Sequence, residues 1–256
     1  SIGDLFIAGI VPGLLMSFLM MGTVFLISQV RGYAGGNAFH VRALAVSIWN
    51  GKYSLMMPVI VLGGIYTGMV TPVEAAVVAV LYALVVAMLV KRTLTFRGLW
   101  DCFTESSTVC GGLTIIMGTA VFFGEYMTMN MIPQSLAAFI IEFVSSKYTL
   151  LIIICIFLLI IGTFMETLAT TMILTPILLP VITTFDIDVI QFGVIMVVTN
   201  AIGMLTPPLG LNLFVACNLT GLSLEQVSSQ VIPFICALIL GLALIAFIPW
   251  LSLVLL

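Results

Sequence analysis

The chain has 256 residues, of which 62% are hydrophobic and only 7% charged, and its mean hydropathy is +1.36. A water-soluble domain carries about 25% charged residues, so this sequence has too few charges to cover a surface that faces water. Its formal net charge of −3, with no basic patch, gives no reason to expect nucleic acid as a partner. The composition therefore predicts a protein that lies mostly in the lipid bilayer.

Apolar segments that can cross a bilayer recur along the chain, since a helix needs about 20 apolar residues to span it. The first covers residues 5–30, and further spans are expected at residues 55–70, 73–90, 109–131 and 231–256. Residues 31–52 mix basic and aromatic side chains, which is typical of an amphipathic helix along the membrane interface. Residues 223–230 are predicted to form a polar loop. These segments indicate an all-α polytopic membrane protein.

Basic residues gather in two places, residues 31–52 and residues 91–97. The positive-inside rule puts both groups on the cytoplasmic side of the membrane. Two predicted spans separate them, with the turn at Thr71 and Pro72 on the outer side. Glu74 follows this turn and is interpreted as a carboxylate at a helix start. Glu125 is interpreted as interfacial.

Two short apolar arms, residues 148–161 and 168–182, flank a polar interruption at residues 162–167. Each arm has only about 15 residues, which is typical of a re-entrant hairpin rather than of two full crossings. Residues 133–144 are also too few for a full crossing, and the topology of residues 132–147 stays open.

The apolar segment 189–219 is broken in its middle by residues 206–212. Paired prolines remove backbone donors and free carbonyl groups, and such a break at membrane depth lies in protein or borders a wet cavity. The break is either a structural kink or a binding site of the kind found in discontinuous transporter helices. We interpret it as a site because glycine, threonine, proline and asparagine gather there.

The polar tip of the hairpin supplies the other half of this candidate site. Threonine in a membrane helix can simply bond back to its own backbone, which accounts for several of the hydroxyls. Glu166 is harder to explain, because an ionisable group at depth is costly and faces a cavity or a partner. The predicted substrate and ion site consists of Gly162, Thr163, Glu166, Thr167, Thr170, Gly203, Thr206, Pro207, Pro208, Gly210 and Asn212.

Hydroxyls and exposed carbonyls are hard oxygen ligands that suit Na⁺, and helix N-termini at the breaks favour an anionic substrate. The predicted Na⁺ ligands are Thr163, Thr167, Gly203, Thr206 and Asn212. The single histidine, His40, and five scattered cysteines give no zinc, disulfide or catalytic pattern, and no two aspartates lie within spans. We therefore expect no catalytic residue, no enzyme activity, and no cofactor other than Na⁺ as the coupling ion.

Five motifs occur in a fixed order: FIAGIVPGLL (6–15), PVIVLGGIYTGMVTPVEAA (58–76), GTFMET (162–167), PILLP (176–180) and GMLTPPLGLNLF (203–214). Together they resemble the large membrane subunit of tripartite ATP-independent periplasmic (TRAP) transporters, and the resemblance runs essentially end to end. It implies a Na⁺-coupled importer of an organic acid anion, such as sialic acid or a C4-dicarboxylate, in the bacterial inner membrane. The implied partners are a small membrane subunit and a periplasmic binding protein that delivers the substrate.

The resemblance also implies the elevator fold of the ion transporter superfamily, with this chain as its second inverted repeat. On that basis residues 1–36 form a scaffold helix and residues 37–100 an interfacial arm helix with scaffold helices. Residues 101–222 belong to the transport domain, with a hairpin at 148–183 and a broken helix at 189–219, and residues 223–256 form the last span. The Gly-Ser-Ser tip and Ile-Pro-Pro-Ser helix of the family's first repeat do not occur, so the chain looks like a C-terminal half that needs the N-terminal half as a further partner. The alternatives are another carboxylate symporter of this superfamily, a channel or purely structural subunit, or an intramembrane enzyme.

Overall fold

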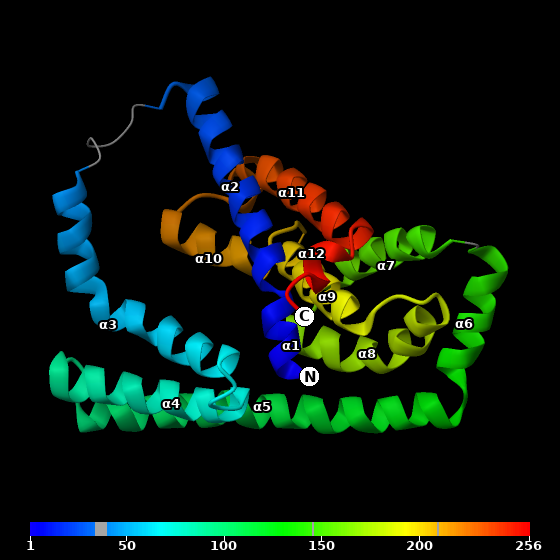
Figure 1. The fold of residues 1–256 in the computed structure, drawn as a ribbon, viewed down its shortest axis with the longest axis horizontal. Helices are drawn as coiled ribbons and strands as arrows, with labels where there is room; N and C mark the ends of the chain where they lie inside the picture. Colours follow the sequence, from blue (N-terminus) through cyan, green and yellow to red (C-terminus); the bar gives the residue numbers. More distant parts are fainter. Residues whose placement is uncertain (34–39, 145, 209) are drawn as a thin grey trace. The chain divides into compact units, whose positions relative to one another are not determined.

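The computed structural model describes residues 1–33, 40–144, 146–208 and 210–256, and helices are the only regular elements in these ranges (Figure 1). Six of the described helices are long and apolar enough to cross a membrane, which confirms an all-α, multi-pass membrane protein. The chain forms two compact units. The first unit comprises Ser1–Ile7 and Gly32–Gly112, and the second comprises Ala8–Arg31 and Leu113–Leu256.

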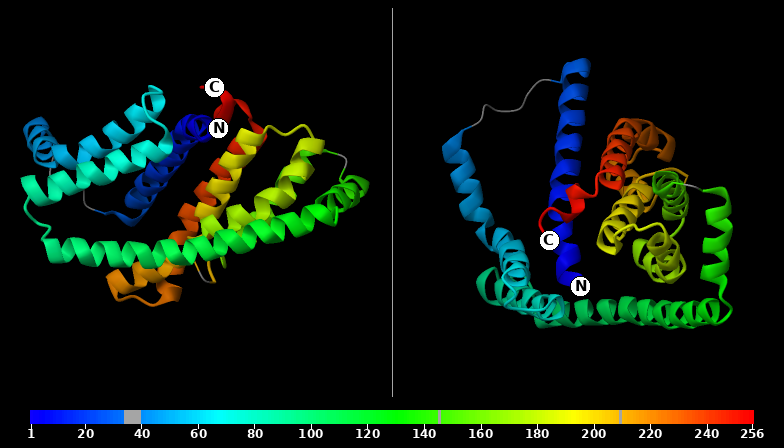
Figure 2. Two further views of the ribbon diagram at one scale, coloured as in Figure 1. Left: turned by 90° about the horizontal axis from the view of Figure 1, so that it is seen from below. Right: turned by 45° about the vertical axis from the view of Figure 1, so that its right-hand side comes forward.

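The first unit is organised around an antiparallel helix pair. Its elements are α1 (Ile2–Ala8, apart from its last residue), α3 (Val41–Tyr66), α4 (Pro72–Leu84), the π-helix η1 (Val85–Val90) and the first part of α5 (Phe96–Met129). Helices α3 and α4 run alongside each other (Figure 2), and the Tyr82 hydroxyl on α4 donates a hydrogen bond to the Tyr53 carbonyl at 2.8 Å. Helix α4 begins with a capping box in which Glu74 bonds the Thr71 backbone N–H at 2.8 Å. Glu74 is thus a carboxylate at a helix start, as the sequence indicates.

Helix α3 joins two segments that the sequence divided into an interfacial helix at 31–52 and a span at 55–70. It continues as one helix across that boundary from Val41 to Tyr66, and the interfacial position predicted for residues 31–52 stays a prediction. Gly51 lies next to the boundary, and one glycine costs about 1 kcal/mol, which does not stop a helix. Residues 34–39 of the predicted interfacial segment lie outside the described part of the chain.

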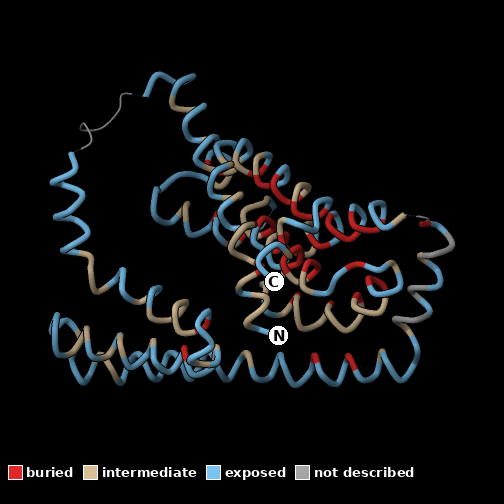
Figure 3. Tube along the Cα trace, in the orientation of Figure 1, coloured by how far each residue is buried: buried red, intermediate tan, exposed pale blue. Residues whose placement is uncertain are grey.

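The second unit is built around α9 (Val189–Gly203). Its other helices are α2 (Ile10–Arg31), the remainder of α5, α6 (Ile132–Phe143), α7 (Lys147–Gly162), α8 (Thr167–Thr184), α10 (Leu211–Thr220), α11 (Leu224–Phe247) and α12 (Trp250–Leu253). Helices α7, α8 and α11 all pack on α9, and nine of its 15 residues are buried. Buried positions accordingly gather along α7, α9 and α11 (Figure 3). Helix α9 is mostly apolar around its circumference because it is enclosed by other helices, although Gln191, Thr199 and Asn200 are buried polar residues on it.

Helix α11 begins earlier than predicted. The polar residues 223–230 were expected to form a loop, but the Ser223 hydroxyl accepts from the Gln226 N–H and the Gln226 side chain accepts from the Ser223 N–H. Ser-x-x-Gln is a capping box, and this motif starts the helix at Leu224. The helix ends at Phe247, before Pro249, so the predicted span at 231–256 is wrong at both ends.

The C-terminal end of α11 is held by a side chain that the sequence did not single out. Gln191 on α9 is 3% exposed, and its Nε2 donates to the carbonyls of Ile245 at 3.2 Å and Ala246 at 3.1 Å. The last carbonyls of a helix have no partner within the helix, so this amide satisfies groups that are otherwise buried and unpaired.

Replacing Gln191 with leucine is expected to lower the free energy of unfolding by about 1–3 kcal/mol, because buried carbonyls lose their donor. Thermal unfolding of the purified transporter in detergent measures the effect. Asn218→Leu is the matched control, since Asn218 on α10 is exposed. An equal loss of stability in both variants would contradict the role of Gln191.

Candidate functional site

Two helix interruptions in the second unit form the candidate site. Helix α7 ends at Gly162 and α8 begins at Thr167, while α9 ends at Gly203 and α10 begins at Leu211. The first interruption covers residues 163–166, within the predicted polar tip. The second covers residues 204–210, so the helix stops before the predicted break at 206–212. The two helices of the predicted hairpin have 16 and 18 residues, and its re-entrant topology stays a prediction.

The two interruptions meet backbone to backbone at Gly162 and Gly203. A Cβ atom added to Gly203 would lie 2.6 Å from the carbonyl carbon of Gly162 and 2.7 Å from its Cα. Real Cβ atoms essentially never approach other atoms so closely, and here the obstacle is main chain that cannot rotate away. Glycine is therefore required for the end of α7 to rest on the end of α9.

Side chains add a second contact between the interruptions. The Thr167 hydroxyl at the start of α8 donates to the Met204 sulfur at 3.4 Å. Thr163 and Thr170 are buried, and their hydroxyls donate to the backbone carbonyls of Ile160 and Glu166. The Thr206 hydroxyl likewise donates to the Ile202 carbonyl at 2.8 Å.

Thr163, Thr170 and Thr206 therefore bond back to their own backbone, which was the simpler of the two interpretations of the sequence. Such a bond uses the hydroxyl hydrogen and leaves lone pairs on the oxygen. A hydroxyl held in this way can still act as an oxygen ligand.

The remaining predicted residues are less enclosed. Glu166 is exposed and immediately precedes α8, but its side chain makes no capping hydrogen bond. Pro207 and Pro208, joined by a cis peptide bond, and Asn212 are exposed too. Gly210 is buried with a φ of +38°. The Asn212 N–H donates to the Met204 carbonyl at 3.2 Å, which ties the two ends of the second interruption together.

Asn200 is a residue of the site that the sequence analysis missed. Its side chain is completely buried, and within the described part of the chain neither amide atom has a hydrogen-bond partner. Its Oδ1 lies 3.3 Å from where a Cβ on Gly162 would be, so the amide faces the junction of the two interruptions. A buried amide without a partner costs about 1–3 kcal/mol. The signal was present in the sequence as a polar residue in an apolar segment, one turn before Gly203.

The junction offers neutral oxygen groups rather than carboxylates or thiols. Among the described residues, no three His, Cys, Asp or Glu side chains gather where they could hold a metal ion. The polar groups at the contact include the Asn200 amide and the main chain of Gly162 and Gly203, and the Thr163 and Thr167 hydroxyls belong to the adjoining interruption. Hard neutral oxygens of this kind suit an alkali or alkaline-earth cation more than a transition metal.

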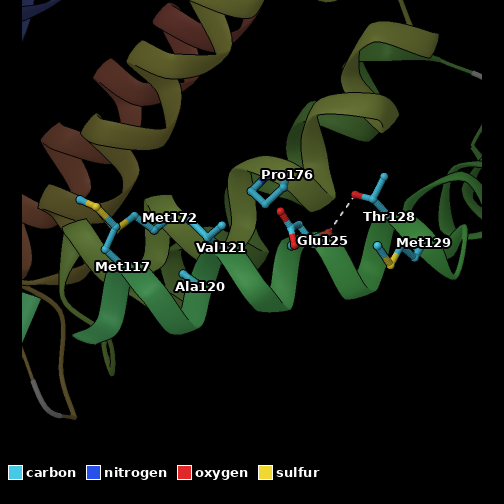
Figure 4. A pocket seen from close by; sticks show the side chains of 9 residues that line it. Met117, Ala120, Val121, Glu125, Thr128, Met129, Met172 and Pro176 are labelled. Atoms are coloured by element: carbon cyan, nitrogen blue, oxygen red, sulfur yellow. Dashed lines mark hydrogen bonds between the residues drawn. The ribbon is translucent and has the colours of Figure 1, made fainter. Parts of the chain in front are cut away.

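A separate groove of about 580 Å³ lies between the second part of α5 and α8. Its walls are mostly apolar, with Met117, Met129 and Met172 among them, and Glu125 is the one acidic side chain at the groove (Figure 4). Figure 4 shows the Glu125 carboxylate directed toward Pro176 on α8. The interfacial position predicted for Glu125 stays a prediction.

Comparison with known proteins gives a consistent set of relatives. A family model described as "Tripartite ATP-independent periplasmic transporter, DctM component" matches residues 1–251. The isethionate TRAP transporter permease protein DctMQ of Oleidesulfovibrio alaskensis is 41% identical over 250 residues. The C4-dicarboxylate large permease DctM of Pseudomonas aeruginosa is 38% identical over 255 residues, and the sialic acid large permease SiaM of Vibrio cholerae is 36% identical over 256.

The alignments cover nearly all of this chain but only part of each relative. They take in 97% of the chain and 39% of the Oleidesulfovibrio protein. For the Pseudomonas and Vibrio proteins they take in 100% of the chain and 60% of the relative. The chain therefore spans between two fifths and three fifths of the length of these relatives.

Proposed function

Because the chain belongs to the DctM family of TRAP transporter components, a family of transporters and not of enzymes, we propose that it forms part of a Na⁺-coupled importer of an organic acid anion. The observation that carries the proposal is the junction of the two helix interruptions, with Asn200 buried and without a partner beside it. The solutes named for three relatives, isethionate, C4-dicarboxylates and sialic acid, are all organic acid anions.

We assign the coupling ion to the junction. Na⁺ is held by the Asn200 amide oxygen together with oxygen atoms of Thr163, Thr167, Gly203, Thr206 and Asn212. A bound cation gives the Asn200 side-chain oxygen the partner that it otherwise lacks, and burying this oxygen without a partner is unfavourable. The positive N-terminal ends of α8 and α10 begin at the same interruptions, and they attract the anionic group of the substrate.

The proposed transport cycle is an elevator movement in the bacterial inner membrane. The Gly162–Gly203 contact joins the hairpin to the broken helix through main-chain atoms. Both interruptions therefore move as one body during the proposed elevator movement. A periplasmic binding protein delivers the substrate, and a small membrane subunit and the N-terminal half of the large subunit complete the permease. Residues that border the substrate are Glu166, Thr170, Pro207, Pro208 and Gly210.

Reconstitution tests the coupling. Proteoliposomes that contain the complete transporter are expected to take up a radiolabelled organic acid anion only with an inward Na⁺ gradient and the binding protein present. An inward K⁺ gradient of the same size is the control. Uptake that is equal in the two gradients would overturn Na⁺ coupling, and uptake without the binding protein would overturn the delivery step.

A further inference from the structure

Two lysines, one on α3 and one directly after η1, lie near the same tyrosine ring in the first unit. The Lys52 ammonium on α3 lies 3.9 Å from the centroid of the Trp49 ring and 5.2 Å from that of Tyr53. The Lys91 ammonium, directly after η1, lies 5.7 Å from the same Tyr53 centroid. The hydrogen bond from Tyr82 to the Tyr53 carbonyl fixes the two helices in this register. Two positive charges are therefore held around one ring by packing.

This basic cluster, Lys52 and Lys91 around Trp49 and Tyr53, has no anionic partner within the described residues. Neither lysine forms an ion pair there, and the nearest acidic residue on α4, Glu74, lies at the opposite end of that helix and is used in its capping box. Lys147 in the second unit differs, because it shares a small cavity with Asp186 and Asp188. A cation–π contact contributes about 0.5–1 kcal/mol at an exposed site, so the rings alone do not compensate two neighbouring like charges.

The surroundings of the cluster indicate the kind of anion that fits it. Helices α3 and α4 with η1 are candidate membrane spans, and Trp49 is 68% exposed. Exposed tryptophan and tyrosine rings lie at the level of the lipid headgroups, and lysine side chains near helix ends extend to the same level. Arg92 follows Lys91, which adds a third basic residue at this end of the pair. Basic pockets between helices on the cytoplasmic side bind anionic lipid headgroups.

We propose that Lys52, Lys91, Trp49 and Tyr53 form a binding site for the phosphodiester headgroup of an anionic phospholipid in the cytoplasmic leaflet. The two ammonium groups, on neighbouring helices, contact the phosphate oxygens, and the rings cover the glycerol and upper acyl region. Because the lysines belong to α3 and to the end of η1, a bound lipid links these two elements. The proposal does not depend on the nature of the transported solute or on Na⁺.

Native mass spectrometry of the intact, delipidated transporter tests the proposal by titration with phosphatidylglycerol or phosphatidylcholine. Wild type is expected to bind phosphatidylglycerol more tightly than phosphatidylcholine. The affinity of Lys52→Gln/Lys91→Gln for phosphatidylglycerol is expected to fall about 25-fold, or about fivefold for each lysine. Lys147→Gln is the matched control, since its ammonium also lies 5.5 Å from a tyrosine ring, that of Tyr148. We expect this control to bind the lipid as wild type does. Lys52→Arg/Lys91→Arg keeps both charges and is expected to bind within a few-fold of wild type.

Four results would overturn the site. The first is that the wild-type transporter shows no preference for the anionic lipid, a result that does not depend on whether any variant folds. The second is a loss in Lys52→Gln/Lys91→Gln no larger than that in Lys147→Gln. The third is retained affinity at high salt, because a site of exposed lysines weakens as ionic strength rises. The fourth is displacement of the lipid by inorganic phosphate at equal concentration, which would indicate a site for free anions.

Discussion

Replacing Gly203 with alanine is expected to abolish Na⁺-driven uptake and to lower the melting temperature of the transporter. The added Cβ would lie 2.6 Å from the Gly162 carbonyl carbon, so α7 and α9 must move apart at the junction. Overpacking a close-packed interior costs about 1–3 kcal/mol, and more where the obstacle is main chain rather than a flexible side chain. Proteoliposome uptake and thermal unfolding in detergent measure the two effects.

Two further alanine variants calibrate this result. A Cβ on Gly162 would meet Asn200 Cα at 3.3 Å and Gly203 Cα at 3.4 Å, which is tight but less severe, so Gly162→Ala is expected to have an intermediate effect. Gly118 on α5 has no atom within 4 Å of an added Cβ, and Gly118→Ala is expected to behave as wild type. Equal activity in the Gly203 and Gly118 variants would show that the glycine contact is not required.

Replacing Asn200 with leucine is expected to separate stability from coupling. Leucine has the same number and branching of side-chain heavy atoms as asparagine and removes two buried polar atoms without partners, so the protein is expected to become no less stable, and by up to about 1–3 kcal/mol more stable. At the same time the Na⁺ concentration for half-maximal uptake is expected to rise by at least about tenfold, since one ligand oxygen of the ion is lost. The substitution is thus expected to maintain or raise the stability of the fold while it weakens Na⁺ binding.

Two further variants decide the role of Asn200: aspartate at the same position, and valine at the neighbouring Thr199. Asn200→Asp keeps an oxygen at the same place, and we expect it to retain Na⁺ dependence better than the leucine variant. Thr199→Val removes a hydroxyl that is equally buried but bonded to the Ile195 carbonyl at 2.6 Å, and its Na⁺ dependence is expected to match wild type. If Asn200→Leu leaves the Na⁺ dependence unchanged, Asn200 is not a ligand, although the wild-type gradient experiment can still show coupling.

The helices themselves are readily predicted from this sequence, and their ends are less so. Long apolar segments identify the spans because few other structures satisfy backbone groups in lipid. The start of α11 was misplaced because Ser223 and Gln226 are polar, and polarity was interpreted as a loop although their spacing forms a capping box. The predicted segments 31–52 and 55–70 share the single helix α3, because a change in composition near Lys52 does not break backbone hydrogen bonding.

The candidate site could be located from the sequence, but its geometry could not. Glycine, threonine and proline mark both interruptions, because these residues are unusual together inside an apolar segment. The pairing of Gly162 with Gly203 depends on how α7 packs on α9, and no local pattern specifies that contact. Asn200 was missed for a related reason, since its significance arises from complete burial without a partner, which only the packed structure reveals.

The wide turns of η1 determine on which side of the helix Lys91 emerges. Its N–H bonds the carbonyl of Val86, five residues back, whereas an α-helix bonds four residues back. If the same sequence continued as an α-helix, each residue would advance by about 100°, and Lys91 would be carried about that far around the axis, away from Tyr53. A chain one residue shorter between Val85 and Val90 would reach the same orientation with ordinary turns. One residue can therefore be removed between the two lysines while the charge keeps its position beside the ring.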